Sequence, residues 1–257
     1  MDISTLVGVL AALVIVFVVQ ALEGGSAASI ILIPSMLLVF GGAFCAAMAG
    51  GILKDAIGVG KAFQKVFLAK VTPPNQLVDE VVKLAERARR EGLLALEDAV
   101  KTVEHPFLKR GLQLAIDGTD PEELHDILHA EVGAKKKADK AGMKIFENMG
   151  GYAPTVGIIG TVMGLVHVLE NLAQPEELGH LIAAAFIATL WGVMSANVIW
   201  LPIGNRLKRL TELEAARMEL VVEGVAAIQA GSNPRIIAQK LSSLLPAGEQ
   251  PTAARAA

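Results

Sequence analysis

The sequence has one cysteine, few aromatic residues and no excess of basic charge, and each shortage excludes a class of protein. Cys45 alone cannot form an intramolecular disulfide or a four-cysteine zinc site. Aromatic residues make up 4% of the chain and the formal net charge is −3, so the stacking surface and the positive charge that nucleic acids require are both lacking. Neither a phosphate-binding loop nor a serine nucleophile elbow is present. We therefore expect no catalytic residue, no metal site, no cofactor and no nucleic-acid partner.

Charged residues make up only 19% of the chain, and they leave long gaps. Four stretches contain no Asp, Glu, Lys, Arg or His: residues 3–22, 24–53, 148–166 and 181–205. Each is close to or above the roughly 20 residues that a helix needs to cross the hydrocarbon of a bilayer. The sequence therefore predicts an all-α membrane protein with four transmembrane helices, at residues 3–22, 27–53, 147–169 and 180–203.

The basic residues predict which side of the membrane each connection faces. Of the 23 Lys and Arg residues, 16 lie between Lys54 and Lys144 and the other seven lie from Arg206 onward. The short links between spans one and two and between spans three and four contain none. Because cytoplasmic loops carry the excess of Lys and Arg, both short links are expected to face outward and both termini to be cytoplasmic.

The two basic parts, residues 54–146 and 204–257, are predicted to be a helical cytoplasmic domain and a helical cytoplasmic tail. Asp120 precedes a proline and two glutamates, which is typical of a helix start. The stretch from Gly231 to Pro234 is typical of one helix ending and another beginning. Residues 54–70 place apolar side chains among four lysines, which favours a helix lying on the anionic inner leaflet.

No carboxylate lies inside any predicted span, although proteins that move ions usually keep one there. If this chain moves protons or sodium, the titrating group is therefore expected from another protein. Oxygen ligands are present: Pro154 frees a helix carbonyl, and Thr155, Thr161 and Thr189 supply hydroxyl groups. Such oxygens suit a dehydrated hard cation, so these four residues are the predicted ion path. The alternative is that they only help the helices to pack.

Two further patterns are typical of structure more than of chemistry. Gly157, Gly160 and Gly164 form a small-residue face, which favours close packing of two membrane helices. His125 and His129 imitate the helical zinc-protease motif, but an aspartate replaces its glutamate and no third ligand is evident. A solvated helix face is the favoured interpretation of the two histidines.

Charged residues crowd around Gly92. Four of them, Arg89, Arg90, Glu97 and Asp98, lie within ten residues. On one continuous helix, Arg89 and Glu97 would lie about two turns apart and point the same way. Blocks of mixed charge are ordinary solvated helix surface, which is one interpretation. The other is a docking surface for a charged partner, because exposed charges steer and orient partners.

Several segments resemble the MotA and PomA family, the membrane proteins of the bacterial flagellar stator. The stretch RREGLLALE, from Arg89 to Glu97, resembles the family's cytoplasmic signature, and GYAPTVGIIGTVMGL at 151–165 resembles its third span. Residues 22–26 resemble its first outer turn, and Trp191-Gly192 with Leu201-Pro202 resemble its fourth span. The resemblance covers about residues 1–245.

The resemblance implies a partner and a mechanism. Family members lie in the bacterial inner membrane and form a homopentamer around two copies of MotB or PomB. These single-span partners anchor to peptidoglycan and carry an essential aspartate. Protons or sodium ions pass at the interface, and the ring pushes the rotor protein FliG through its cytoplasmic charges. The partner's aspartate would be the carboxylate that the spans lack.

The resemblance also assigns roles to individual residues. The rotor-facing charges of the family match Arg89, Arg90, Glu97 and Asp98. Pro154 and Pro202 match two prolines linked to torque coupling. Thr161 and Thr189 match hydroxyls that line the ion path in sodium-type members, so sodium is slightly favoured over protons.

Three other functions stay open. The ExbB and TolQ energisers of the same superfamily usually have three spans and lack the cytoplasmic signature, so residues 22–26 and 89–97 argue against them. A passive ion channel would conduct without a partner. A membrane scaffold would use Pro154 and Thr161 only for packing.

Overall fold

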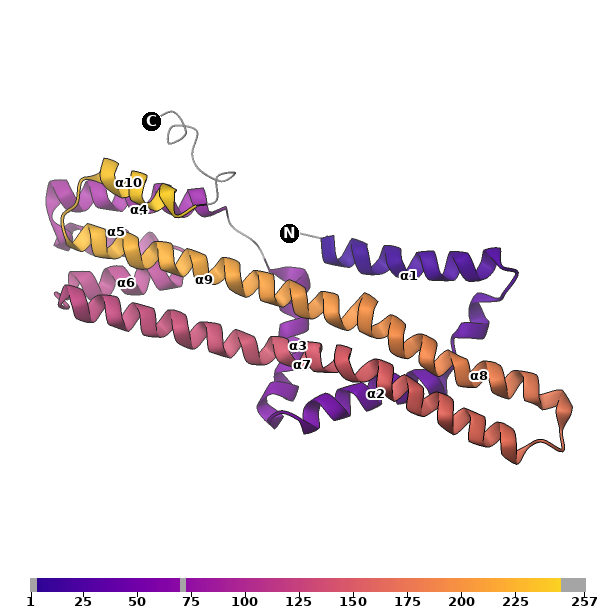
Figure 1. Ribbon diagram of the computed structural model, residues 1–257. Helices are drawn as coiled ribbons and strands as arrows, with labels where there is room; N and C mark the ends of the chain where they lie inside the picture. Colours follow the sequence, from indigo (N-terminus) through magenta and orange to yellow (C-terminus); the bar gives the residue numbers. More distant parts are fainter. Residues whose placement is uncertain (1–3, 70–72, 246–257) are drawn as a thin grey trace. The chain divides into compact units, whose positions relative to one another are not determined.

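The computed structural model describes residues 4–69 and 73–245, so the first residue of the predicted first span and the last 12 residues of the predicted tail lie outside it. Within these ranges every element is a helix, which confirms the predicted fold class (Figure 1). The chain divides into two units. Unit 1 contains residues 1–70 and 139–210, and unit 2 contains residues 71–138 and 211–257.

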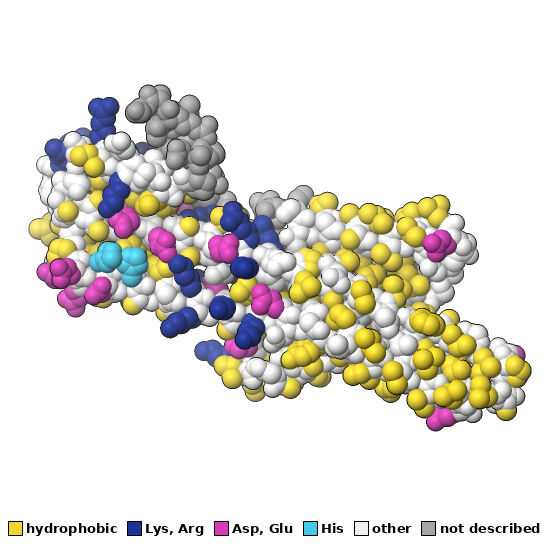
Figure 2. Space-filling view, in the orientation of Figure 1, with side chains coloured by type: hydrophobic (Ala, Val, Ile, Leu, Met, Phe, Trp, Pro, Cys, Tyr) yellow, Lys and Arg dark blue, Asp and Glu magenta, His cyan; other side chains and the backbone are white. Residues whose placement is uncertain are grey.

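Unit 1 contains the apolar helices. Its elements are α1 (Ser4–Leu22), the 3-10 turn η1 (Ala27–Ile30), α2 (Ile33–Ala49), α3 (Leu53–Leu68), the C-terminal part of α7 (Pro121–Glu170), α8 (Pro175–Met194), the π-helical turn η3 (Ser195–Trp200) and the start of α9 (Leu201–Gln229). No residue of α1 is buried. Figure 2 shows hydrophobic side chains over the visible face of α8 and of the C-terminal half of α7. Apolar surface of this extent indicates contact with lipid or with other chains.

Three described helices are long and apolar enough to cross a membrane, namely Ser4–Leu22, Pro121–Glu170 and Pro175–Gln229. The apolar helix Ile33–Ala49 has 17 residues, at the short end of the roughly 17 to 25 that a span uses. It begins later than the expected residue 27, because η1 and an extended residue, Leu32, precede it. Four spans are thus compatible with the structure, with the second the shortest.

The predicted boundaries between span and cytoplasmic helix fall inside continuous helices. α7 runs unbroken for 50 residues, which is about 75 Å at 1.5 Å per residue. The helix that begins at Pro175 likewise continues through η3 and α9 for 55 residues. Each of these long helices therefore contains residues of both unit 1 and unit 2, with no loop between them.

A buried tryptophan of α8 binds the turn η1, just before α2. The indole Nε1 of Trp191 donates a 2.6 Å hydrogen bond to the carbonyl oxygen of Ile30. Phe40 of α2 packs against the rings of both Trp191 and Trp200, with centroid distances of 5.8 and 5.6 Å. The buried apolar side chains around these rings belong to α2, α7, α8 and η3. This cluster fixes which faces of α2 and α8 meet.

The helix α3 packs against α7 through apolar and ionic contacts. Val66 is buried in a cluster with Phe146 of α7 and Ile203 of α9. Lys65 Nζ lies 3.0 Å from Asp139 Oδ2, and the Asp139 side chain is 17% exposed, so the pair is partly shielded from solvent. Leu53, Ile57, Phe63 and Leu68 of α3 remain exposed, and contact of this helix with the inner leaflet stays a prediction.

Unit 2 is a bundle of short helices around parts of α7 and α9. Its own elements are α4 (Pro74–Glu91), the 3-10 turn η2 (Leu93–Ala95), α5 (Leu96–Thr102), α6 (Pro106–Ile116) and α10 (Pro234–Ser243), which packs against α4 (Figure 1). The predicted helix starts are confirmed, because Asp120 accepts a 2.9 Å hydrogen bond from the Glu122 N–H and Asn233 accepts one of 3.0 Å from the Arg235 N–H. One apolar core, which includes Leu108, joins these helices.

Candidate functional site

The predicted small-residue face of α7 packs directly against α8. A Cβ atom placed on Gly157 would lie 2.8 Å from the backbone oxygen of Ala188, and one on Gly164 would lie 2.6 Å from the Cβ atom of Ala185. The α8 side of this contact is also small, because Gly192 lies against Gly157. The two backbones therefore touch, as is typical of tightly packed membrane helices.

Four oxygen atoms meet at one point of this contact. Thr161 Oγ1 lies 3.2 Å from the carbonyl oxygen of Gly157, 3.0 Å from that of Ala185 and 2.5 Å from Thr189 Oγ1. The structure thus brings Thr161 and Thr189 together across α7 and α8. A hydroxyl has one proton, so Thr161 can donate to only one of these three acceptors at a time. Such a group of oxygens has the composition that hard cations prefer.

Thr155, which was expected on the same path, lies apart from this group. Its side chain is exposed, and its hydroxyl donates a 2.8 Å hydrogen bond to the carbonyl oxygen of Tyr152 in the same helix. Within the described residues it makes no hydrogen bond to Thr161 or Thr189. The exposed face of α7 that carries Thr155 also carries Ile158, so Thr155 is placed to meet a molecule outside this chain.

The two prolines act on neighbouring stretches of backbone. Pro154 lies inside α7 and leaves the Gly150 carbonyl without its helical donor, yet α7 continues through it. Pro202 follows the π-helical turn Ser195–Trp200, which the sequence did not predict. A Cβ atom on Gly150 would lie 2.6 Å from Leu201 Cδ2, so the backbone that Pro154 disturbs contacts the residue before Pro202. Missing donors and a π turn mark places where a helix can bend.

The expectation that Arg89 and Glu97 share one continuous helix is wrong. α4 ends at Glu91, and Gly92 adopts a φ of +85°, which a residue with a side chain rarely adopts. η2 follows, and a new helix, α5, begins at Leu96. Arg89 therefore lies in the last turn of α4 and Glu97 in the first turn of α5, where each charge is favourable to its helix dipole.

The four signature charges differ in their partners. All of them are exposed. Asp98 Oδ1 accepts a 2.7 Å hydrogen bond from Lys101 Nζ, and this ion pair holds the pKa of the Asp98 carboxyl below its usual value. Among the described residues, Arg89, Arg90 and Glu97 make no ion pair and no side-chain hydrogen bond. The charges of Arg89, Arg90 and Glu97 are thus more available to a partner protein than the charge of Asp98.

The histidine pair lies on an exposed face of α7, with the ring centroids of His125 and His129 4.2 Å apart. Their Nε2 atoms are 3.1 Å apart. No group of three or more His, Cys, Asp or Glu side chains suited to a metal was found in the part of the chain that the structure describes. A zinc-protease arrangement of these histidines therefore has no third protein ligand there.

Some residues that build the site had only a weak signal in the sequence. Ala185, Ala188 and Gly192 recur at intervals of three and four, which is a small-residue pattern like that of α7. Nothing in the sequence indicated that Trp191 would bind the backbone of Ile30, since 161 positions separate the two residues.

Comparison with known proteins decides the family. A family model described as the MotA/TolQ/ExbB proton channel family matches residues 99–220. Motility protein A of Bacillus subtilis is 37% identical over 251 residues, which are 97% of this chain and 93% of that protein. The chain belongs to the MotA/PomA family. The resemblance inferred from the Arg89–Glu97 signature and from residues 151–165 of the third span is thereby confirmed.

Other members of the MotA/PomA family agree along almost the whole length. Chemotaxis protein PomA of Vibrio alginolyticus is 31% identical over 250 residues, covering 97% of this chain and 98% of that protein. The solved flagellar MotAB stator complex from Bacillus subtilis matches with a TM-score of 0.89 and 37% identity, covering 96% of this chain and 98% of the other. The structure of C. jejuni MotAB matches with a TM-score of 0.91 and 30% identity, over 96% and 97%. The fold is therefore that of a MotA subunit.

Proposed function

We propose that this MotA-family chain is a flagellar motor stator subunit which, with a MotB-type partner, converts a proton or sodium gradient into torque on the rotor. The observation that carries the proposal is an ion path that is incomplete in this chain. Thr161 and Thr189 gather oxygen ligands between α7 and α8, yet residues 148–166 and 181–205 contain no titratable carboxylate. A channel that couples ion flow to work needs such a group.

The partner is proposed to supply that group as an aspartate on a single span. Two solved relatives are MotAB complexes, which supports a MotB-type partner. The exposed apolar residues of α7, among them Ile158, Val162 and Val166, give a face on which a partner helix can pack. Thr155 lies on the exposed side of the same helix, within reach of such a partner.

The proposed ion is sodium in preference to protons. Thr161 Oγ1 is hydrogen-bonded among the Thr189 hydroxyl and two carbonyl oxygens, and a dehydrated cation can use these four oxygens once the hydrogen bonds open, whereas a proton needs fewer. The test is the swimming speed of cells that carry this chain, with sodium varied at fixed pH. A speed that is independent of sodium would assign protons instead.

Torque is proposed to reach the rotor protein FliG through unit 2. Arg89, Arg90 and Glu97 are exposed and make no ion pair with any residue that the structure describes, whereas Asp98 is neutralised in part by Lys101. Exposed charges of this kind orient a partner more than they add to its affinity. We rank Glu97 above Asp98 for this reason. The subunit is proposed to assemble as a homopentamer in the bacterial inner membrane, with both termini cytoplasmic.

The experiment that tests the function is genetic complementation. Expression of this chain with its MotB-type partner is expected to restore swimming in a motile strain whose stator genes are deleted. A matched pair in which Pro154→Leu replaces the wild-type chain should reach the membrane at the same level and fail to rotate the motor. A well-expressed wild-type pair that leaves the cells non-motile would contradict the proposal.

A passive channel is distinguished by conductance. This chain alone, reconstituted in liposomes, is expected not to conduct sodium or protons, because its spans lack the carboxylate. Conductance without a partner would favour the passive channel over the stator subunit.

A further inference from the structure

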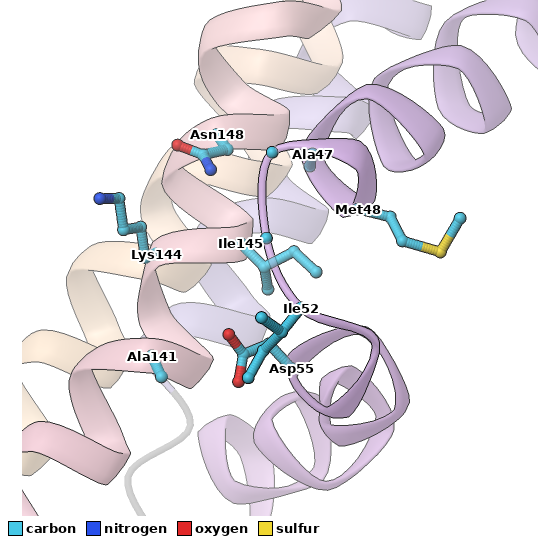
Figure 3. A pocket seen from close by; sticks show the side chains of 10 residues that line it. Ala47, Met48, Ile52, Asp55, Ala141, Lys144, Ile145 and Asn148 are labelled. Atoms are coloured by element: carbon cyan, nitrogen blue, oxygen red, sulfur yellow. The ribbon is translucent and has the colours of Figure 1, made fainter.

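A pocket of about 400 Å³ lies in unit 1, where α2 ends and α3 begins. Its walls come from the end of α2, the turn after it, the first turn of α3 and the middle of α7 (Figure 3). The glycine pair Gly50-Gly51 lines one side, so the backbone itself is exposed there. The pocket therefore lies between the end of the apolar helix α2 and the start of α3, which carries lysines.

Opposite charges line this pocket without meeting, and Figure 3 shows the Lys144 side chain pointing away from Asp55. Asp55 of α3 and Lys144 of α7 both line it, and Asn148 lies one turn beyond Lys144. Among the described residues, none of the three side chains makes a hydrogen bond or an ion pair. Elsewhere on α3 and α7 an ion pair does form, because Lys65 Nζ lies 3.0 Å from Asp139 Oδ2. A carboxylate and an ammonium that stay apart across a cavity are suited to a ligand that carries both charges.

The remainder of the pocket is apolar. Met48, Ile52 and Ile145 line it, and Ile52 is 61% exposed. Its neighbours Leu53 and Ile57 on α3 are 68% and 74% exposed. Large apolar side chains exposed beside lysines are typical of a helix at the boundary between headgroups and acyl chains. The ligand is therefore expected to be an amphiphile at that depth.

We propose that this pocket binds the headgroup of a phospholipid that carries a phosphate and a primary ammonium, the phosphoethanolamine type. Lys144 Nζ and the Asn148 amide donate to the phosphate, and Asp55 accepts from the ammonium. A headgroup with only negative charge would lie against the Asp55 carboxylate. A choline headgroup has no N–H to donate to it. The glycerol and the first methylene groups then lie on Ile52 and Met48.

Lipid binding to the purified complex of this chain with its MotB-type partner tests the proposal. The complex is stripped of lipid in detergent and titrated, by native mass spectrometry, with phosphatidylethanolamine, phosphatidylcholine and phosphatidylglycerol of identical acyl chains. Phosphatidylethanolamine is expected to bind about tenfold more tightly than phosphatidylcholine, the effect of a hydrogen bond to a charged group. Asp55→Asn should remove this preference. Lys144→Gln should weaken phosphatidylethanolamine binding about tenfold, whereas Lys140→Gln, one turn away and outside the pocket, should not.

Several results would overturn the assignment. They are equal binding of the three lipids, a preference for phosphatidylglycerol, an Asp55→Asn variant that keeps the wild-type preference, or equal effects of the two lysine variants. Absence of bound lipid would overturn it as well. The proposal rests on the membrane location of unit 1 and not on torque, so lipid binding can fail while complementation succeeds, and the reverse.

Discussion

The contact between α7 and α8 gives the sharpest prediction, which concerns Gly157→Ala. The new Cβ atom would lie 2.8 Å from the Ala188 backbone oxygen, 3.1 Å from the Gly192 Cα and 3.2 Å from the Thr189 Cα. Ordinary van der Waals contact begins at 3.4 Å, and all three neighbours are backbone atoms that cannot rotate away. The helices must separate, which costs about 1–3 kcal/mol for overpacking of this kind.

Gly151→Ala is the matched control. It lies on the same helix, is exposed, and has no atom within 4 Å of the new Cβ position. Alanine there removes the entropic cost of glycine and should stabilise the helix by about 0.5–1 kcal/mol. Gly157→Ala has the same entropic gain, so the two alanine variants are expected to differ by the overpacking cost, about 1–3 kcal/mol in the free energy of unfolding.

Denaturant unfolding of the purified stator complex measures this difference. Circular dichroism reports the helices, and the fluorescence of Trp191 and Trp200 reports the cluster around Phe40 beside the contact. Swimming speed should fall with Gly157→Ala, because separation of the helices also moves Thr161 from Thr189. Equal midpoints for the two variants would show that the backbones are not in contact at Gly157 and would refute the reasoning.

Three more predictions concern other parts of the chain. Burial lowers the pKa of His105, whose Nδ1 accepts the Leu108 N–H and caps α6. The unfolded chain therefore takes up the proton first as the pH falls below about 6.5, and stability decreases from there downward. His105→Asn keeps a cap that does not titrate, so a pH series of unfolding midpoints should flatten; an unchanged slope would contradict this. Trp191→Phe leaves the Ile30 carbonyl without its donor and should cost about 1–3 kcal/mol in denaturant unfolding, which wild-type stability would disprove. Glu97→Lys should lower motor torque in a bead assay while the complex still assembles. The control Glu104→Lys should leave both torque and assembly unchanged. Loss of the oligomer in Glu97→Lys would contradict the prediction, because Glu97 would then be needed for assembly.

The prediction for Arg89 and Glu97 failed because it used only their spacing in the sequence. Spacing alone placed Arg89 and Glu97 on one helix, but Gly92 takes a positive φ and ends α4 between them. The local signal was present, since basic residues followed by glycine are typical of a helix C-terminus. The π turn before Pro202 had a weaker signal, because a proline predicts a disturbed helix without saying which kind.

The sequence by itself determined the apolar helices, the helix starts at Asp120 and Asn233, and the family. These follow from charge-free length, from capping residues and from motifs, all of which are properties of neighbouring residues. Only the tertiary structure decided that Thr161 meets Thr189, that Gly157 touches Ala188, and that the charges of Asp55 and Lys144 share a pocket without pairing. The rotation of each helix about its own axis sets these contacts. That rotation depends on side chains that pack from distant parts of the chain.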